Sequence, residues 1–153
     1  MLEPFANHDI EKELGKMGVL VVSSRSLYRH IKHLLHIDLD SYKIKRAAHK
    51  YLKDSPGGEA INTVGEARSF IKKGVDGVVH IFPFTCMPEN IALEALQKMS
   101  EDYSIPVLSL SIDEHTSQTG LITRLEAFID ILKRTGKQRA KSRTANSLLL
   151  TPH

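Results

Sequence analysis

The sequence has a single cysteine, Cys86, among 153 residues, and this scarcity limits the chemistry that the chain can carry alone. One cysteine cannot form an internal disulfide, so we expect a reducing, cytoplasmic location. It also cannot hold an iron–sulfur cluster by itself, because such clusters usually take about four protein ligands. The chain offers no second group of histidines and cysteines at a zinc-binding spacing.

Long apolar runs and nucleotide-binding motifs are also missing. No apolar run approaches the roughly 18 residues that span a bilayer, so no membrane partner is expected. The opening residues lack the basic region and apolar core of a signal peptide. Gly57 and Gly58 form neither a GxGxxG motif nor a P-loop, and nothing else predicts a nucleotide site.

Charge is distributed unevenly along the chain. The formal net charge is +3, but six cations lie between residues 133 and 143, and no acidic residue follows Asp130. Without those six, 15 basic residues face 18 acidic ones, a net charge of −3. We expect residues 137–153 to form a basic, disordered tail, with contact to acyl-CoA phosphates as an alternative. No nucleic-acid partner is expected, because no aromatic residues interleave with the charges.

Apolar patterning predicts both strands and helices. Near-continuous β-branched runs predict buried strands over 75–82 and 105–112, with a shorter candidate over 19–22. Helical spacing predicts helices over 9–17, 63–73, 88 to about 100, and 121–132, with weaker signals over 27–35 and 44–52. Thr63 is expected to open its helix through a capping box, and Gly136 is expected to end the last helix.

The alternation of these elements predicts the fold class. Strands separated by helices indicate βαβ units and a mostly parallel sheet. Right-handed crossovers place helices on both faces of such a sheet. We therefore expect a small three-layer α/β domain over residues 1–136, Rossmann-like or flavodoxin-like. Three strands make a small sheet, so the chain is expected to be a fragment of a larger protein.

Two loops carry the candidate functional residues. Ligands of open parallel sheets bind beyond the carboxyl ends of the strands. This selects the loop over 83–90, which holds Cys86, and the loop over 113–120, which opens with Asp113, Glu114 and His115. Arg124 follows in the last helix, where it could reach back toward the second loop. We predict a substrate-binding group made of Asp113, Glu114, His115 and Arg124.

Each candidate has an alternative interpretation. Cys86 precedes a helix amino terminus, which stabilises a thiolate for attack or for binding a soft metal, but it could also pack as a small hydrophobe. Asp113, Glu114 and His115 offer acid, base or metal-ligand groups, or simply form a polar turn. Arg124 is able to hold a phosphate or carboxylate in bidentate fashion, or to pair with Glu126 or Asp113. The histidines at 30, 33 and 36 are interpreted as a solvated face.

Several of these segments together resemble one known family. It is the 2-hydroxyacyl-CoA dehydratase D-component family, as found in CoA-substrate-specific enzyme activase-related proteins. The resemblance covers residues 1 to about 135. The segments that carry it, in order, are 2–8, 57–58, 62–65, 74–79, 83–89 with the pattern Pro-Phe-x-Cys-x-Pro, 105–108, 113–116 and 123–128.

The resemblance implies a reaction class and a cofactor. Dehydratases of this family remove water from (R)-2-hydroxyacyl-CoA through a ketyl radical, after an ATP-driven activator injects an electron. Their [4Fe-4S] cluster is held by cysteines from different domains, and Cys86 matches the motif cysteine. Cys86 is therefore expected to be a single iron–sulfur ligand in the full-length protein, with no cluster bound to this chain alone.

The sequence also departs from the family. The other cluster cysteines and the activator's ATPase motifs are absent, and Gly57-Gly58-Glu59-Ala60 stands where the family shows Gly-Gly-His-Gly-like text. We therefore expect a non-autonomous module of a lyase-type protein, with no residue assigned to catalysis. Its expected partners are other domains of the same polypeptide or dehydratase subunits, and acyl-CoA.

The sequence leaves two other functions open. A non-catalytic binding or assembly domain would tolerate replacement of Cys86. A phosphoacceptor domain with Asp113 as the acceptor ranks below it, because the acidic cluster and lysine that such a site needs are not evident.

Overall fold

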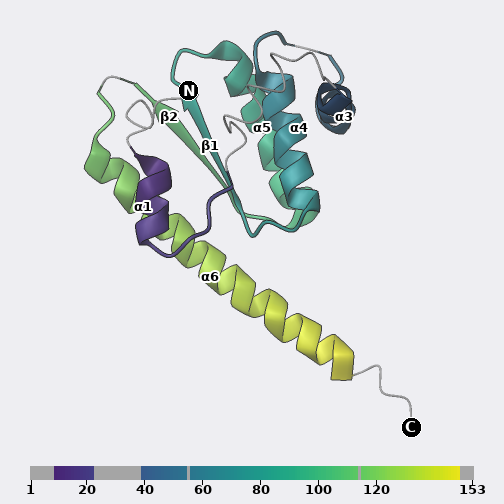
Figure 1. Ribbon diagram of the computed structural model, residues 1–153, viewed down its shortest axis with the longest axis vertical. Coiled ribbons are helices and arrows are strands. Elements are labelled where there is room, and N and C mark those ends of the chain that lie inside the picture. Colours follow the sequence, from purple (N-terminus) through teal and green to yellow (C-terminus); the bar gives the residue numbers. More distant parts are fainter. Residues whose placement is uncertain (1–8, 23–38, 55, 114, 149–153) are drawn as a thin grey trace.

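The computed structural model in Figure 1 describes residues 9–22, 39–54, 56–113 and 115–148. The described elements are, in order, α1 (Ile10–Lys16), α3 (Leu39–Ala48), α4 (Ala60–Lys72), β1 (Val78–Pro83), α5 (Met87–Tyr103), β2 (Val107–Ile112) and α6 (Gln118–Leu148). These elements confirm the predicted α/β class. The helix predicted over 27–35 lies outside the described residues.

The sheet over the described residues consists of two parallel strands. β1 pairs with β2 in a register that places Val78 opposite Val107 and Pro83 opposite Ile112. Helix α5 connects the two strands, which makes β1-α5-β2 a βαβ unit. Both strands therefore end at the same edge of the sheet.

Helices cover both faces of this sheet, which gives three layers. Helices α3, α4 and α5 enclose one apolar cluster, against which Val78 and Val107 pack. Helices α1 and α6 enclose a second apolar cluster on the opposite face of the sheet. The strand residues that point to that face, among them Val79, Leu108 and Leu110, belong to it or pack against it. Figure 1 shows α4 and α5 on one side of the strands and α1 and α6 on the other. The predicted arrangement of helices on both faces is confirmed.

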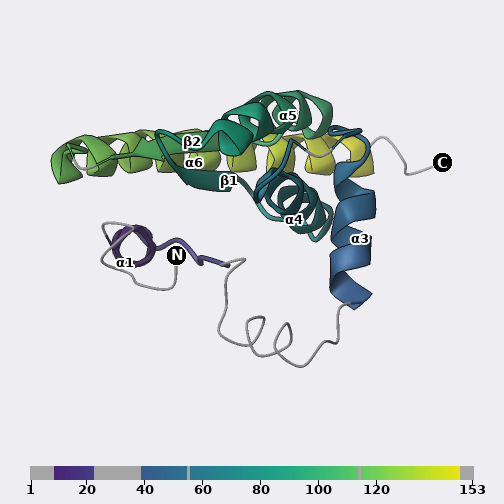
Figure 2. The ribbon, with the colours of Figure 1, turned by 90° about the horizontal axis from the view of Figure 1, so that it is seen from above.

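Helix α3 lies across α4 at the edge of the molecule, as Figure 2 shows from above. The two helices approach closely at Gly65, which is buried in α4 and lies next to Ile44 of α3. A side chain on Gly65 would overlap the backbone of Ile44. The helix predicted over 44–52 is present as α3, which runs from Leu39 to Ala48 and so begins and ends earlier than predicted.

The strand predicted over 19–22 is wrong, because these residues form no regular element. Val19 and Val21 pack against the α1–α6 cluster. Leu20 and Val22 are 90% and 58% exposed. This alternation of inward and exposed side chains is typical of an extended chain, but residues 19–22 make no strand pairing with β1 or β2. Apolar alternation predicted the inward residues correctly and could not predict a hydrogen-bonded partner.

Several predicted helix boundaries also differ from those of the structure. Helix α4 begins at Ala60 with Glu59 as its N-cap, so Thr63 lies inside the first turn and the predicted capping box is wrong. Gly74, with φ of 90°, follows the end of α4, where a left-handed backbone favours glycine.

Helix α6 continues past Gly136 to Leu148, so the predicted end at Gly136 is wrong. A glycine inside a helix costs only about 1 kcal/mol, and the residues after it include good helix formers. Figure 1 shows the second half of α6 extending away from the sheet. The domain boundary at 136 stays a prediction. Over the described residues, no helix combines the length and apolar character that crossing a bilayer requires.

Candidate functional site

The two candidate loops meet at the carboxyl edge of the sheet. Pro83 at the end of β1 lies opposite Ile112 at the end of β2. The backbone N–H of Phe84 donates to the carbonyl of Ile112 over 3.1 Å, which joins the loop that holds Cys86 to the last residue of β2. The loop with Cys86 and the loop beginning at Asp113 therefore share one rim, which we call the carboxyl rim.

Cys86 stands at the amino end of α5, as its N-cap residue. Its backbone φ of −82° and ψ of 95° are extended, and its N–H donates to the carbonyl of Pro83 over 3.0 Å. Its own carbonyl accepts from the backbone N–H and the side-chain Nδ2 of Asn90, both at 3.1 Å. The thiol makes no capping hydrogen bond and is half-buried. The sulfur is therefore available to a partner outside the helix.

Exposed apolar side chains flank this cysteine. Phe84 is 66% exposed, Met87 73% and Ile91 44%. Met87 and Ile91 are one turn apart on α5, and Phe84 precedes them in the loop. We call these three residues the rim patch. Large apolar side chains that are exposed close together in the chain are candidates for contact with another molecule.

Beneath the rim lies a buried chain of polar side chains. His80 of β1 and Glu89 of α5 are only 5% and 7% exposed. His80 Nε2 lies 2.8 Å from Glu89 Oε2. The hydroxyl of Thr63, in α4, donates to the other carboxylate oxygen of Glu89 over 3.0 Å. The chain thus links β1, α5 and α4 directly below the helix turn that carries Cys86.

The imidazole of His80 is fixed from two further sides. It stacks on the ring of Phe82, with 4.8 Å between the ring centroids and 12° between the planes. Ser109, the register partner of His80 on β2, has its hydroxyl 3.5 Å from His80 Nδ1. We call Thr63, Glu89, His80 and Ser109 the buried polar chain. Every buried side-chain nitrogen and oxygen atom of the described residues has a hydrogen-bond partner.

Sequence reasoning did not identify this chain as a unit. The sequence predicts a strand over 75–82, a helix from residue 88 and a cap at Thr63, but it does not link His80, Glu89 and Thr63 to one another. One signal was present: a histidine inside an otherwise apolar strand must find a buried partner, because an unpaired polar group there is costly. The sequence does not indicate which residue that partner is.

Asp113 closes a local turn on the other side of the rim. Its Oδ1 accepts from the hydroxyl of Thr116 at 2.7 Å and from the backbone N–H of His115 at 3.1 Å. The Thr116 hydroxyl, followed by the His115 N–H, holds the pKa of the Asp113 carboxyl below its usual value. This geometry matches the polar-turn alternative for Asp113. His115 is exposed, and Glu114 lies outside the described residues.

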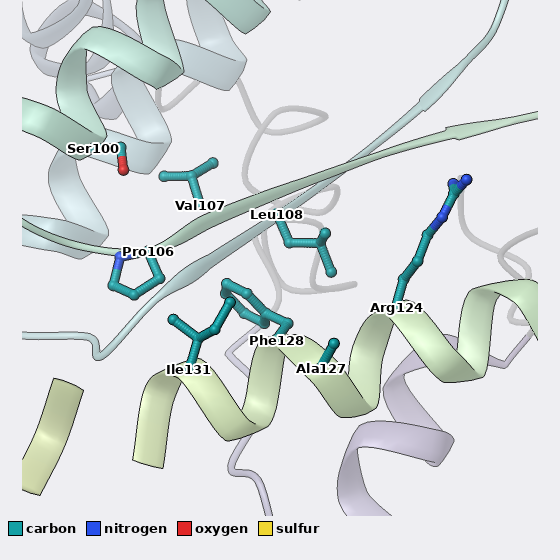
Figure 3. A pocket seen from close by; sticks show the side chains of 8 residues that line it. All are labelled: Ser100, Pro106, Val107, Leu108, Arg124, Ala127, Phe128 and Ile131. Atoms are coloured by element: carbon teal, nitrogen blue, oxygen red, sulfur yellow. The ribbon is translucent and has the colours of Figure 1, made fainter. Parts of the chain in front are cut away.

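Arg124 lies nearly two turns into α6, and its side chain is exposed. It pairs with neither Asp113 nor Glu126 within the described ranges. It lines a groove of about 410 Å³ along the edge of β2 that faces away from β1. The groove is lined by Ser100, Pro106, Val107, Leu108, Arg124, Ala127, Phe128 and Ile131. Figure 3 shows Arg124 at the opposite end of this row from Pro106 and Ile131.

The structure thus brings together some of the predicted site residues and not others. The loops of Cys86 and Asp113 share the carboxyl rim, whereas Arg124 lines the groove beside β2. In the part of the chain that the structure describes, no three histidine, cysteine, aspartate or glutamate side chains gather as they would around a metal ion.

The family assignment rests on a comparison with protein-family models. Residues 4–132 match the model described as 2-hydroxyglutaryl-CoA dehydratase, D-component. No curated protein and no solved structure matches the chain. The matched range includes both strands, the carboxyl rim and the buried polar chain. The chain therefore belongs to the 2-hydroxyglutaryl-CoA dehydratase D-component family.

Proposed function

We propose that this chain is a module of a 2-hydroxyacyl-CoA dehydratase-like or activase-related protein, in which Cys86 supplies one ligand to a [4Fe-4S] cluster shared with other domains or subunits. When bound, such a cluster supplies the electron for radical dehydration of an acyl-CoA. The observation that carries this proposal is the position of Cys86: a half-buried thiol without a capping bond, at the carboxyl rim of a parallel sheet.

The surroundings of Cys86 fit a shared site. A cluster needs further ligands, which the described residues do not provide near Cys86. The rim patch offers an apolar surface beside the thiol that a second polypeptide would cover. An apolar cover would also exclude water from the cluster, which affects its reduction potential. The module would therefore not be active alone.

Arg124 is proposed to contact the acyl-CoA. Its guanidinium is exposed at one end of the groove beside β2, and a guanidinium binds phosphate through paired hydrogen bonds. The apolar remainder of the groove suits the uncharged part of a ligand. Asp113 contributes by shaping the loop rather than by direct contact, and His115 offers an exposed ring beside it.

Anaerobic iron and sulfide reconstitution of the full-length protein tests the role of Cys86. We expect Cys86→Ser to lower the bound iron and the brown absorbance, while Thr85→Ser, an exposed change in the same loop, leaves both unchanged. Equal iron content and an equal absorbance spectrum in Cys86→Ser would remove Cys86 as a ligand. That result would favour the alternative of a non-catalytic binding or assembly domain, which the rim patch also supports.

A further inference from the structure

Helix α5 begins in an unusual way for a helix with glutamate in its first turn. A glutamate at the third helical position often reaches back to the N–H of the N-cap residue. Glu89 occupies that position, but the N–H of the N-cap Cys86 bonds to Pro83 instead. The Glu89 side chain turns inward and is 7% exposed. A carboxylate that could have capped its own helix is therefore used to bind other elements.

Those bonds attach the first turn of α5 to two neighbouring elements. Glu89 Oε2 lies 2.8 Å from His80 Nε2 on β1, and Glu89 Oε1 accepts from the Thr63 hydroxyl on α4 over 3.0 Å. His80 cannot turn away easily, since it is stacked on Phe82 and adjacent to Ser109. Two hydrogen bonds in different directions fix both the position and the rotation of this turn.

Stability alone does not account for such an arrangement. Burying ionisable groups carries a desolvation cost, and well-packed apolar side chains of similar volume often stabilise a fold as well or better. Hydrogen bonds differ from apolar packing because they have preferred directions. A polar chain at this place therefore gives the first turn of α5 a defined orientation that apolar packing would not impose.

We propose that Glu89 and His80, with Thr63 and Ser109, are positioning residues that fix the direction in which Cys86 presents its sulfur at the carboxyl rim. This role rests on the proposed function for what the sulfur binds, but the geometry itself is independent of the ligand. Cys86 lies three residues before Glu89, at the start of the same turn. A shift of that turn moves the thiol with it.

The sole cysteine of the chain provides a direct test. A nitroxide spin label attached to Cys86 of the full chain reports the mobility of this position in its electron paramagnetic resonance spectrum. In the wild type we expect a dominant immobilised component. In Glu89→Ala the mobile component should increase by at least about 10-fold, the population change expected from losing a hydrogen bond to a charged group.

Matched variants separate positioning from general destabilisation. Glu89→Gln keeps an oxygen and a nitrogen for both bonds and should restore the wild-type spectrum. Glu94→Ala, an exposed change on the same helix, should leave it unchanged. Spectra are recorded far below the unfolding midpoint of each variant, measured by circular dichroism. Thr63→Val removes the hydrogen bond between Thr63 and Glu89 while it keeps the shape of the side chain. This variant replaces Glu89→Ala as the test if Glu89→Ala does not fold, and it should give a spectrum between those of the wild type and Glu89→Ala.

Two outcomes would overturn the positioning role. One is a Glu89→Ala or Thr63→Val spectrum that equals the Glu94→Ala spectrum. The other is a Glu89→Gln spectrum as mobile as that of Glu89→Ala. Failure of the proposed function is detected by a different measurement. If Cys86→Ser binds as much iron as the wild type, Cys86 is not a cluster ligand, but the spin-label spectra still report whether Glu89 fixes its position. The two failures are therefore distinguishable.

Discussion

His80 and Glu89 form a buried pair with 2.8 Å between Nε2 and Oε2, although they lie on different elements. We expect His80→Leu to lower the free energy of unfolding by about 3–5 kcal/mol, because the carboxylate is left buried without its main partner. The double variant His80→Leu/Glu89→Leu should regain much of this loss. Urea denaturation measures the free energy of unfolding of the wild type and of both variants. A single variant as stable as the wild type would contradict the pairing.

Gly65 permits the close approach of α3 and α4. A Cβ atom at this position would lie 2.6 Å from Ile44 Cγ2 and closer still to the Ile44 backbone. Gly65→Ala should therefore destabilise the chain by about 1–3 kcal/mol, the usual cost of overpacking. Gly15→Ala is the control, since its Cβ would meet nothing within 4 Å. That change should stabilise α1 by about 0.5–1 kcal/mol. Equal thermal midpoints for the two variants would show that the helices do not touch at Gly65.

A surface cluster at the other end of α5 should make stability depend on acid pH. Lys50 Nζ and the Tyr51 hydroxyl each lie 2.7 Å from Asp102 Oδ2. The Lys50 ammonium, followed by Tyr51, lowers the pKa of Asp102 from 3.8. A lowered folded-state pKa gives a contribution that is present above pH 3.8 and is lost as the pH falls through the folded-state value.

We therefore expect the unfolding free energy of Asp102→Asn to decline less than that of the wild type between neutral pH and pH 3. The effect should be small, because Lys50 and Asp102 are exposed and water screens the pair. Equilibrium urea denaturation at a series of pH values is the measurement. Parallel pH profiles for the two proteins would indicate that the cluster does not form in solution.

Arg124 should affect binding of coenzyme A if the groove beside β2 holds part of that ligand. Replacing Arg124 by Gln removes a charge-assisted hydrogen bond and is expected to weaken binding by roughly 10-fold. Isothermal titration with coenzyme A measures the dissociation constants. Arg134→Gln, an exposed change further along the same helix, serves as the control. Equal affinities in the two variants would exclude a specific role for Arg124.

The sequence by itself determined the features that depend on neighbouring residues in the chain. The nearly continuous apolar runs over 75–82 and 105–112 predicted buried strands, and the structure has β1 over Val78–Pro83 and β2 over Val107–Ile112. The helix predicted from residue 88 corresponds to α5, which begins at Met87, and the helix predicted to end at residue 73 corresponds to α4, which ends at Lys72. Parallel strand order then implied that the loops of Cys86 and Asp113 share one edge, and the register of β1 with β2 shows this geometry.

Only the tertiary structure decided which distant residues meet. Thr63, His80, Glu89 and Ser109 lie on four different elements, α4, β1, α5 and β2, and nothing in their sequence spacing indicates that they form one buried chain. The same holds for the extended residues 19–22, whose alternation gave the inward side chains but no strand partner. Periodicity reports which side of an element is buried, whereas a hydrogen bond between elements depends on how they pack in three dimensions.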